Sequence, residues 1–332
     1  MIKILFGFLI VLAVVVWGYG WATNQFTPIT VSFSPSQITG DVERYLREKE
    51  AKFLDIKPGL EKQIIWNDPQ TKEKTRYSVI YIHGFSASKE EIRPVPDNVA
   101  SLLGANLYFT RLPGHGRTSA AMLEASYNDW VDDLAEAIEI GRRIGEEVII
   151  ICTSLGGTLT GWAAMDAPAQ QKDVVAIVFV SPVFKIYASG SFMLTAPYAD
   201  IIVPLAIGPY RNTDPNADMD KLYAWNICYP NEALLPLAQF IKLVSIAKPE
   251  AAKIPALFIY DPNDIVSDET VTASYFEKWG AQKDRLIIKQ SGDPNNHVIA
   301  GDLYSPGNNI IVTNKIMTWL STMGIQGLSE KL

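Results

Sequence analysis

Cysteine and histidine are both scarce in this chain. Its 332 residues contain two cysteines, Cys152 and Cys228, and three histidines. The two cysteines make neither a disulfide framework nor a metal site, so we expect no metal centre. The net charge is −7 and no basic run carries interleaved aromatic residues, which argues against a nucleic-acid partner. Chemistry that needs an imidazole must use His83, His115 or His297.

Charge is also missing from the first part of the chain. No residue between Lys3 and Asp41 is charged, and residues 4–22 are mostly apolar with three aromatic residues near their end. This stretch is about long enough to cross a bilayer as a helix. Positive charge on the Lys3 side alone predicts that the N-terminus stays in the cytoplasm and that the rest is exported.

We therefore predict an N-terminal membrane anchor over residues 1–22, followed by a linker over residues 23–40. A cleaved signal peptide is the alternative, because a small residue at Gly20 and another at Ala22 offer a cleavage site. In that case the chain would be exported in a soluble form.

After residue 41, apolar strand-like runs alternate with helical segments. Strands are expected near residues 63–66, 78–82, 106–110, 148–152, 174–180, 256–260 and 286–289. Helices are expected near residues 41–53, 96–103, 127–145, 155–165, 268–279 and 309–318. This alternation predicts an α/β fold, in which a mainly parallel central sheet carries helices on both faces. Active sites of such sheets form at the carboxyl ends of the strands.

One segment breaks the alternation. Residues 183–250 are rich in proline, aromatic and apolar residues, and we interpret them as a cap inserted between residues 41–182 and residues 251–332 of the core. The apolar character favours an acyl-chain pocket or a surface that contacts lipid. A cap that merely packs on the domain beneath it would show the same composition.

The most informative stretch is residues 148–157. A run of β-branched residues leads into Ser154, and two glycines follow. The pattern predicts a strand that turns sharply into a helix and exposes the serine hydroxyl at the turn. Residues two before and two after the serine must be small; Gly156 meets this need, and Cys152 stands where glycine is usual. An ordinary serine in a β-to-α turn is the alternative.

A second turn supplies hydrogen-bond donors. His83 and Gly84 follow the strand at residues 78–82, and the glycine lets the backbone direct its next N–H groups above the sheet. We expect the N–H groups of Phe85 and Leu155 to form an oxyanion hole, aided at Leu155 by the positive end of a helix. We interpret His83 as a structural residue that holds the loop.

A carboxylate and a histidine each follow a later strand. Asp264 lies in the loop after residues 256–260, where a Pro-Asn turn lets the chain reach the middle of the sheet edge; Asp261 is the alternative. His297 ends the polar loop after the last strand. Its place after the serine and the acid favours it as the base over His115, which lies in an early turn.

The order serine, aspartate, histidine, each after its own strand, is that of α/β hydrolases. Residues 63–320 resemble a bacterial α/β hydrolase of the monoacylglycerol-lipase, carboxylesterase and serine-aminopeptidase-like group. His83-Gly84-Phe85-Ser86 resembles the oxyanion turn of that group, and residues 111–116 resemble its turn after the next strand. The chain departs from the group at Cys152-Thr153, where Gly-His is usual.

The resemblance implies an α/β-hydrolase fold and hydrolysis of acyl or lipid-type carboxylic esters through an acyl-enzyme. His297 would take the proton of Ser154, and Asp264 would orient the imidazole. No cofactor is expected. The expected partners are a small acyl ester or lipid, and the membrane through the N-terminal helix and the apolar cap. The location implied is the bacterial inner membrane, with the catalytic domain on the periplasmic side.

Three alternatives remain open. A serine aminopeptidase would need an acidic residue for a free α-amine, and the cap offers Asp214, Asp218, Asp220 and Glu232. An acyltransferase would share every motif and differ in how well its pocket excludes water. A membrane-tethered binding protein without activity would keep the same fold.

Overall fold

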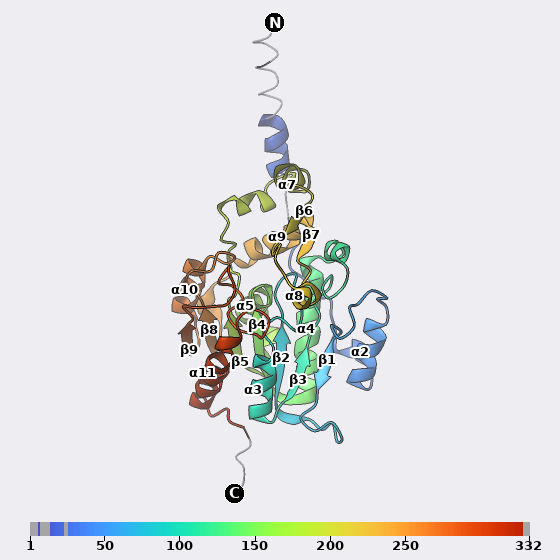
Figure 1. Cartoon of the computed structure of the whole chain (residues 1–332), viewed down its shortest axis with the longest axis vertical. Helices are drawn as coiled ribbons and strands as arrows, with labels where there is room; N and C mark the ends of the chain where they lie inside the picture. Colours follow the sequence, from blue (N-terminus) through green and yellow to red (C-terminus); the bar gives the residue numbers. More distant parts are fainter. Residues whose placement is uncertain (1–5, 7–13, 23–25, 328–332) are drawn as a thin grey trace.

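A seven-stranded sheet forms the centre of the molecule (Figure 1). The computed structural model describes residues 6, 14–22 and 26–327. The strand order is β1-β3-β2-β4-β5-β8-β9; β1 pairs antiparallel with β3, and all other neighbours are parallel. The predicted α/β fold with a mainly parallel sheet is confirmed. The strands are β1 (Gln63–Ile65), β2 (Thr75–Ile82), β3 (Asn106–Phe109), β4 (Gly145–Thr153), β5 (Val174–Val180), β8 (Ala256–Tyr260) and β9 (Lys283–Ile287).

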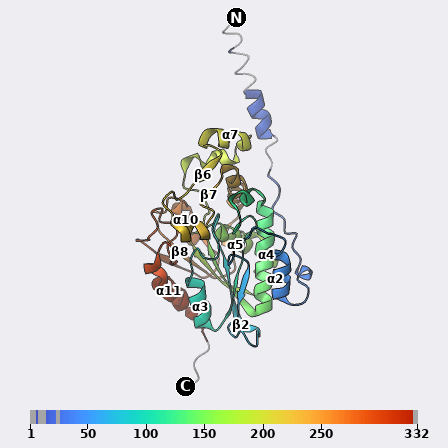
Figure 2. The same cartoon turned by 45° about the vertical axis from the view of Figure 1, so that its right-hand side comes forward.

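Helices cover both faces of the sheet. Figure 2 shows α3 and α11 on one side of the strands and α4 on the other. Buried side chains of α4, α5 and α10 belong to one apolar cluster, and those of α3 and α11 belong to a second. These helices are α3 (Val95–Leu103), α4 (Tyr127–Ile144), α5 (Leu155–Asp166), α10 (Glu269–Lys278) and α11 (Asn309–Thr322). After residue 26, the remaining helices outside residues 183–248 are η1 (Pro35–Gln37), α2 (Val42–Glu50), η2 (Ser119–Leu123), α6 (Pro168–Gln171), η5 (Pro249–Ala251) and η6 (Pro306–Asn308).

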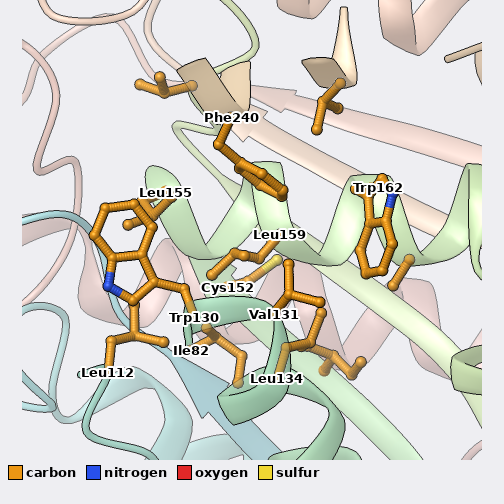
Figure 3. Close-up of a cluster of buried hydrophobic side chains, with 14 of the residues drawn as sticks. Ile82, Leu112, Trp130, Val131, Leu134, Cys152, Leu155, Leu159, Trp162 and Phe240 are labelled. Carbon is orange, nitrogen blue, oxygen red and sulfur yellow. The ribbon is translucent and has the colours of Figure 1, made fainter. Parts of the chain in front are cut away.

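Buried side chains of α4 and α5 pack against the end of β4. Figure 3 shows Trp130 of α4 and Leu155 of α5 in one cluster with Ile82 and Cys152, which come from neighbouring strands. All four are buried. Burial raises the pKa of the Cys152 thiol, so this side chain stays neutral and acts as a small apolar group. The turn after β4 therefore rests on a packed core.

The edge strand β9 differs from its prediction. It spans Lys283–Ile287 rather than residues 286–289, and its first three residues are charged. Because β9 lies at the sheet edge and its side chains are only partly buried, hydropathy did not mark it. Its register comes from pairing with β8, where Ala256 lies opposite Lys283.

The segment 183–250 lies over the carboxyl ends of the strands and contains more regular structure than its sequence indicates. It comprises η3 (Ser189–Thr195), α7 (Ala199–Ile207), β6 (Tyr210–Asn212), α8 (Met219–Ala224), β7 (Cys228–Pro230), η4 (Asn231–Ala233) and α9 (Leu234–Val244). Figures 1 and 2 place α7 and the β6–β7 hairpin at the outer end of the molecule. Helix α9 instead packs on the core, where the Phe240 ring contacts the rings of Tyr127 and Trp162.

The predicted anchor, residues 1–22, lies largely outside the described residues. Residues 14–22 are helical and lie beside α7, where the Tyr198 hydroxyl donates to the carbonyl oxygen of Val16 at 3.0 Å. Among the helices that the structure describes, none has both the length and the hydropathy required to span a bilayer.

Candidate active site

Ser154 occupies a strained turn between β4 and α5. Its backbone has φ 52° and ψ −115°, a conformation that side-chain-bearing residues rarely adopt. A Cβ atom added to Gly156 would lie 2.2 Å from the Ile82 carbonyl oxygen, so β2 presses directly against this turn. The small residue at position 156 is therefore a steric requirement.

The structure brings three predicted residues together at this turn. The Ser154 Oγ lies 2.9 Å from His297 Nε2, and His297 Nδ1 lies 2.6 Å from Asp264 Oδ2. Asp264 Oδ1 accepts the backbone N–H groups of Val266 and Ser267 at 2.7 and 3.0 Å. Because the carboxylate can only accept, the neutral ring carries its one proton on Nδ1, and Nε2 is then free to accept from the serine hydroxyl.

Asp293 fixes the backbone of the loop that carries His297. Its Oδ2 atom accepts the backbone N–H groups of His297 and Val298 at 3.1 and 2.9 Å. Asp293 was not predicted from the sequence. Its signal is a carboxylate four residues before the histidine, in a polar loop with one glycine and two asparagines whose backbone donors need partners.

The charges around His297 determine its protonation. Burial lowers its pKa, but the charge and hydrogen bond of Asp264 outweigh this effect and raise the pKa to about 9. Glu269 is also buried near this pair. Burial, followed by the charge of Asp264, raises the pKa of Glu269 to about 8, so Glu269 is largely neutral at pH 7. Asp264 is then the carboxylate that acts on the imidazole.

Two backbone donors beside the serine are unused. Within the described residues, no acceptor takes the N–H of Phe85 or of Leu155. Leu155 is the first residue of α5, where the helix leaves its N–H groups unpaired and contributes positive potential. Phe85 and Ser154 line the same cavity. The pair is available to an oxygen atom bound near the serine hydroxyl.

The alternative residues take other roles. Asp261 Oδ1 accepts the backbone N–H of Asn263 at 2.8 Å and so closes its own turn. His115 Nδ1 lies 3.0 Å from the Pro113 carbonyl oxygen, a hydrogen-bond contact within its own turn. His83 bridges two loops, because Nε2 accepts the Leu112 N–H at 3.0 Å. Burial lowers the pKa of His83 to about 4, which keeps its ring neutral.

A cavity of about 450 Å³ opens onto Ser154 and His297. Most of its wall is apolar, and elements of residues 183–250 supply much of it: Met193, Leu194, Val203, Ala206, Ile207, Leu234 and Leu237. Asp214 is the one cap carboxylate of the four proposed amine ligands that lines this cavity, and Tyr304 donates to its Oδ2 at 2.8 Å. In the part of the chain that is described, no cluster of His, Cys, Asp and Glu could hold a metal ion.

Comparison with known proteins gives consistent matches. A family model described as the alpha/beta hydrolase family matches residues 79–298. The thermostable monoacylglycerol lipase of Bacillus sp. (strain H-257) is 25% identical over 202 residues, which cover 60% of this chain and 75% of that enzyme.

Solved structures share the fold. A monoacylglycerol lipase of Paleococcus ferrophilus has a TM-score of 0.57 at 17% identity, over 79% of this chain and 98% of that one. A monoglyceride lipase of Saccharomyces cerevisiae, solved with a substrate analog, has a TM-score of 0.58 at 16% identity, over 79% of this chain and 91% of that one.

Proposed function

Because the chain belongs to the alpha/beta hydrolase family and is an ester hydrolase of its lipase- and esterase-like group, we propose that Ser154, His297 and Asp264 are its catalytic triad. One observation supports this proposal above all others. The serine oxygen, both imidazole nitrogens and one carboxylate oxygen lie in an unbroken line of hydrogen bonds of 2.9 and 2.6 Å.

The reaction proceeds in two stages. His297 Nε2 takes the hydroxyl proton as Ser154 Oγ attacks the ester carbonyl, and the oxyanion accepts the N–H groups of Phe85 and Leu155. The protonated imidazole, stabilised by Asp264, then gives its proton to the leaving alcohol as the C–O bond breaks. Water, deprotonated by His297, attacks the acyl-enzyme and releases the carboxylic acid and the free serine.

The apolar cavity favours an acyl chain as the part of the substrate held under the cap. Leu194, Val203 and Leu237 provide no partner for a peptide backbone, and Asp214 already accepts the Tyr304 hydroxyl. A free α-amine would have to compete with that hydrogen bond. Together with the similarity to a monoacylglycerol lipase, this supports monoacylglycerols or related medium-length lipid esters as substrates over aminoacyl substrates.

A substrate panel with one variant tests the proposal. Purified protein is assayed on p-nitrophenyl and glyceryl esters of increasing chain length, on aminoacyl anilides, and on esters with added glycerol as acyl acceptor. We expect ester hydrolysis and labelling by a fluorophosphonate probe, and both should vanish in Ser154→Ala. Ser191→Ala, a change in the same cavity away from the triad, should keep both. Undiminished ester cleavage by Ser154→Ala would refute the assignment.

The outer end of the cap supports a position at a membrane. Phe192, Ile201 and Leu205 are 70%, 57% and 80% exposed, and the helix of residues 14–22 lies against the same elements. These helical residues belong to the uncharged stretch of residues 4–22 in the sequence. We propose that the N-terminal segment anchors the protein, with the cap facing the outer leaflet of the inner membrane.

Vesicle binding and topology reporters test this location. Co-sedimentation with phosphatidylcholine vesicles should fall in Leu205→Asp and stay unchanged in Ile310→Asp, which alters a similarly exposed residue of α11. An alkaline phosphatase fusion after residue 40 should be active. Equal vesicle binding by the two variants, or an inactive fusion, would contradict the proposal.

A further inference from the structure

Glu91 is a buried carboxyl group that the proposed reaction does not use. It lies between β2 and α3 and is 2% exposed. Its Oε2 atom accepts the Gly84 N–H at 2.8 Å and the Tyr81 hydroxyl at 2.7 Å. Gly84 directly precedes Phe85, so Glu91 fixes the peptide next to the first proposed oxyanion donor.

The hydrogen bonds of Tyr81 extend toward Leu155, the second proposed oxyanion donor. The Tyr81 oxygen lies 3.1 Å from Thr153 Oγ1, and both residues are fully buried. Because the Tyr81 proton goes to Glu91, the Thr153 hydroxyl donates to Tyr81. Thr153 directly precedes Ser154, and Leu155 follows. The chain of hydrogen bonds therefore joins the Gly84 turn to the nucleophile turn.

The second carboxyl oxygen of Glu91 points to the reaction centre. A Cβ atom added to Gly84 would lie 2.6 Å from Glu91 Oε1 and 2.9 Å from Ser154 Cβ, so these two atoms flank the same glycine. Glu91 also lines the cavity, and Oε1 has no hydrogen-bond partner among the described residues.

The charge state of Glu91 matters at this position, because a carboxylate would repel an oxyanion forming nearby. Burial raises the pKa of Glu91, and its hydrogen bonds from Gly84 and Tyr81 and the charge of His297 lower it in part. Tyr81 and His297 are the titratable groups that act on it. Burial outweighs the other contributions, so the net effect is a raised pKa of Glu91.

We propose that Glu91 is a positioning residue, which holds the two oxyanion donors at a fixed separation through the chain Gly84–Glu91–Tyr81–Thr153. The inference rests on the proposed function of Ser154 and the two N–H groups. It explains Thr153 at the position where related hydrolases usually have histidine: a small hydroxyl there completes the chain to Tyr81.

Four variants test the role of this chain, with Glu90→Ala as the matched control. Glu90 is the neighbouring glutamate, and its side chain pairs with Arg93 instead. In Glu91→Ala we expect kcat to fall about tenfold or more, short of the roughly 10²–10³ typical for outright loss of a donor. KM should change by less than about twofold, because the donors act on the transition state. Glu91→Gln keeps an acceptor oxygen without charge and should recover most of the activity.

A transition-state mimic separates positioning from general stability. A trifluoromethyl ketone adds to Ser154 and places an oxyanion on the donors, so its affinity should fall in Glu91→Ala by about the same factor as kcat/KM. Thermal melting of each variant is measured alongside. Tyr81→Phe and Thr153→Val each remove one hydroxyl, and their effects should be less than additive when combined.

Three results would overturn the inference: wild-type kcat in Glu91→Ala, equal impairment of Glu91→Gln and Glu91→Ala, or unchanged affinity for the ketone. If Glu91→Ala fails to fold, the two hydroxyl deletions and their double variant decide the question. Failure of the proposed function is distinguishable, because it appears as activity in Ser154→Ala whatever Glu91 does.

Discussion

Asp264→Asn replaces one oxygen by an amide nitrogen at a site whose contacts are known. The asparagine oxygen can stay with the N–H groups of Val266 and Ser267, which places the NH₂ group against His297 Nδ1. Since both groups cannot donate to each other, the ring must release its Nδ1 proton and carry it on Nε2. That nitrogen faces Ser154 and can then no longer accept the hydroxyl proton.

The expected loss is large. The same exchange in a serine protease lowers kcat by about 10⁴, which corresponds to about 5 kcal/mol of activation free energy. The variant also loses the charge that raises the pKa of His297 from 6.5 to about 9 against the effect of burial. We therefore expect wild-type activity to rise with pH up to about 9, as the histidine loses its proton, and the residual activity of the variant to reach its plateau below about pH 6.5.

The free energy of unfolding should also depend on pH through the raised pKa of His297. A histidine whose pKa is raised on folding stabilises the folded state below its unfolded pKa, and this contribution disappears as the pH rises through the folded pKa. Between pH 6.5 and 9 the wild type should lose about 3 kcal/mol of unfolding free energy from this source, and Asp264→Asn should not.

Steady-state hydrolysis of p-nitrophenyl butyrate between pH 6 and 10, with urea unfolding at three pH values, measures both effects. Asp261→Asn is the matched control, because its carboxylate contacts its own turn and not the imidazole. A tenth or more of wild-type kcat in Asp264→Asn, or an equal loss in the control, would refute the reasoning.

Three further predictions concern the turn, the core and the cavity. In Gly156→Ala the added Cβ would lie 2.2 Å from the Ile82 carbonyl oxygen. Urea unfolding should show a loss of unfolding free energy above the roughly 1–3 kcal/mol of ordinary overpacking. Unchanged stability would contradict this prediction. Lys62→Met removes the ion-pair partner of buried Asp133 and leaves Glu136 with Lys49 alone, which should cost about 3–5 kcal/mol of unfolding free energy. Lys72→Met, at an exposed pair, should cost under about 1 kcal/mol, and similar losses in the two variants would argue against the buried pair. Val203→Phe narrows the cavity and should lower kcat/KM for dodecanoyl esters more than for butyryl esters; an unaltered chain-length profile would exclude the cavity as the acyl site.

Several elements follow from local sequence alone. Helix α4 begins at a capping box formed by Ser126 and Asp129, and the apolar runs of β4 and β5, rich in β-branched residues, predict buried strands. The turn at Ser154 was predictable because small residues on both sides are a local steric condition. The order of serine, aspartate and histidine in the chain predicted that three strand ends would meet.

Other features depend on contacts between distant segments. Asp261 and Asp264 belong to one turn with the same local chemistry, and only the side-chain directions show that Asp264 meets His297. The charged start of β9 hides this strand until its pairing with β8 is known.

Glu91 is the clearest case. Its sequence context, Lys89-Glu90-Glu91, is that of a solvated surface turn, yet the fold buries this carboxyl group against Gly84 and Tyr81. Local sequence determines backbone preference and amphipathic pattern over a few residues. Tertiary packing alone determines which polar groups lose their water, and therefore which of them must find partners in the protein.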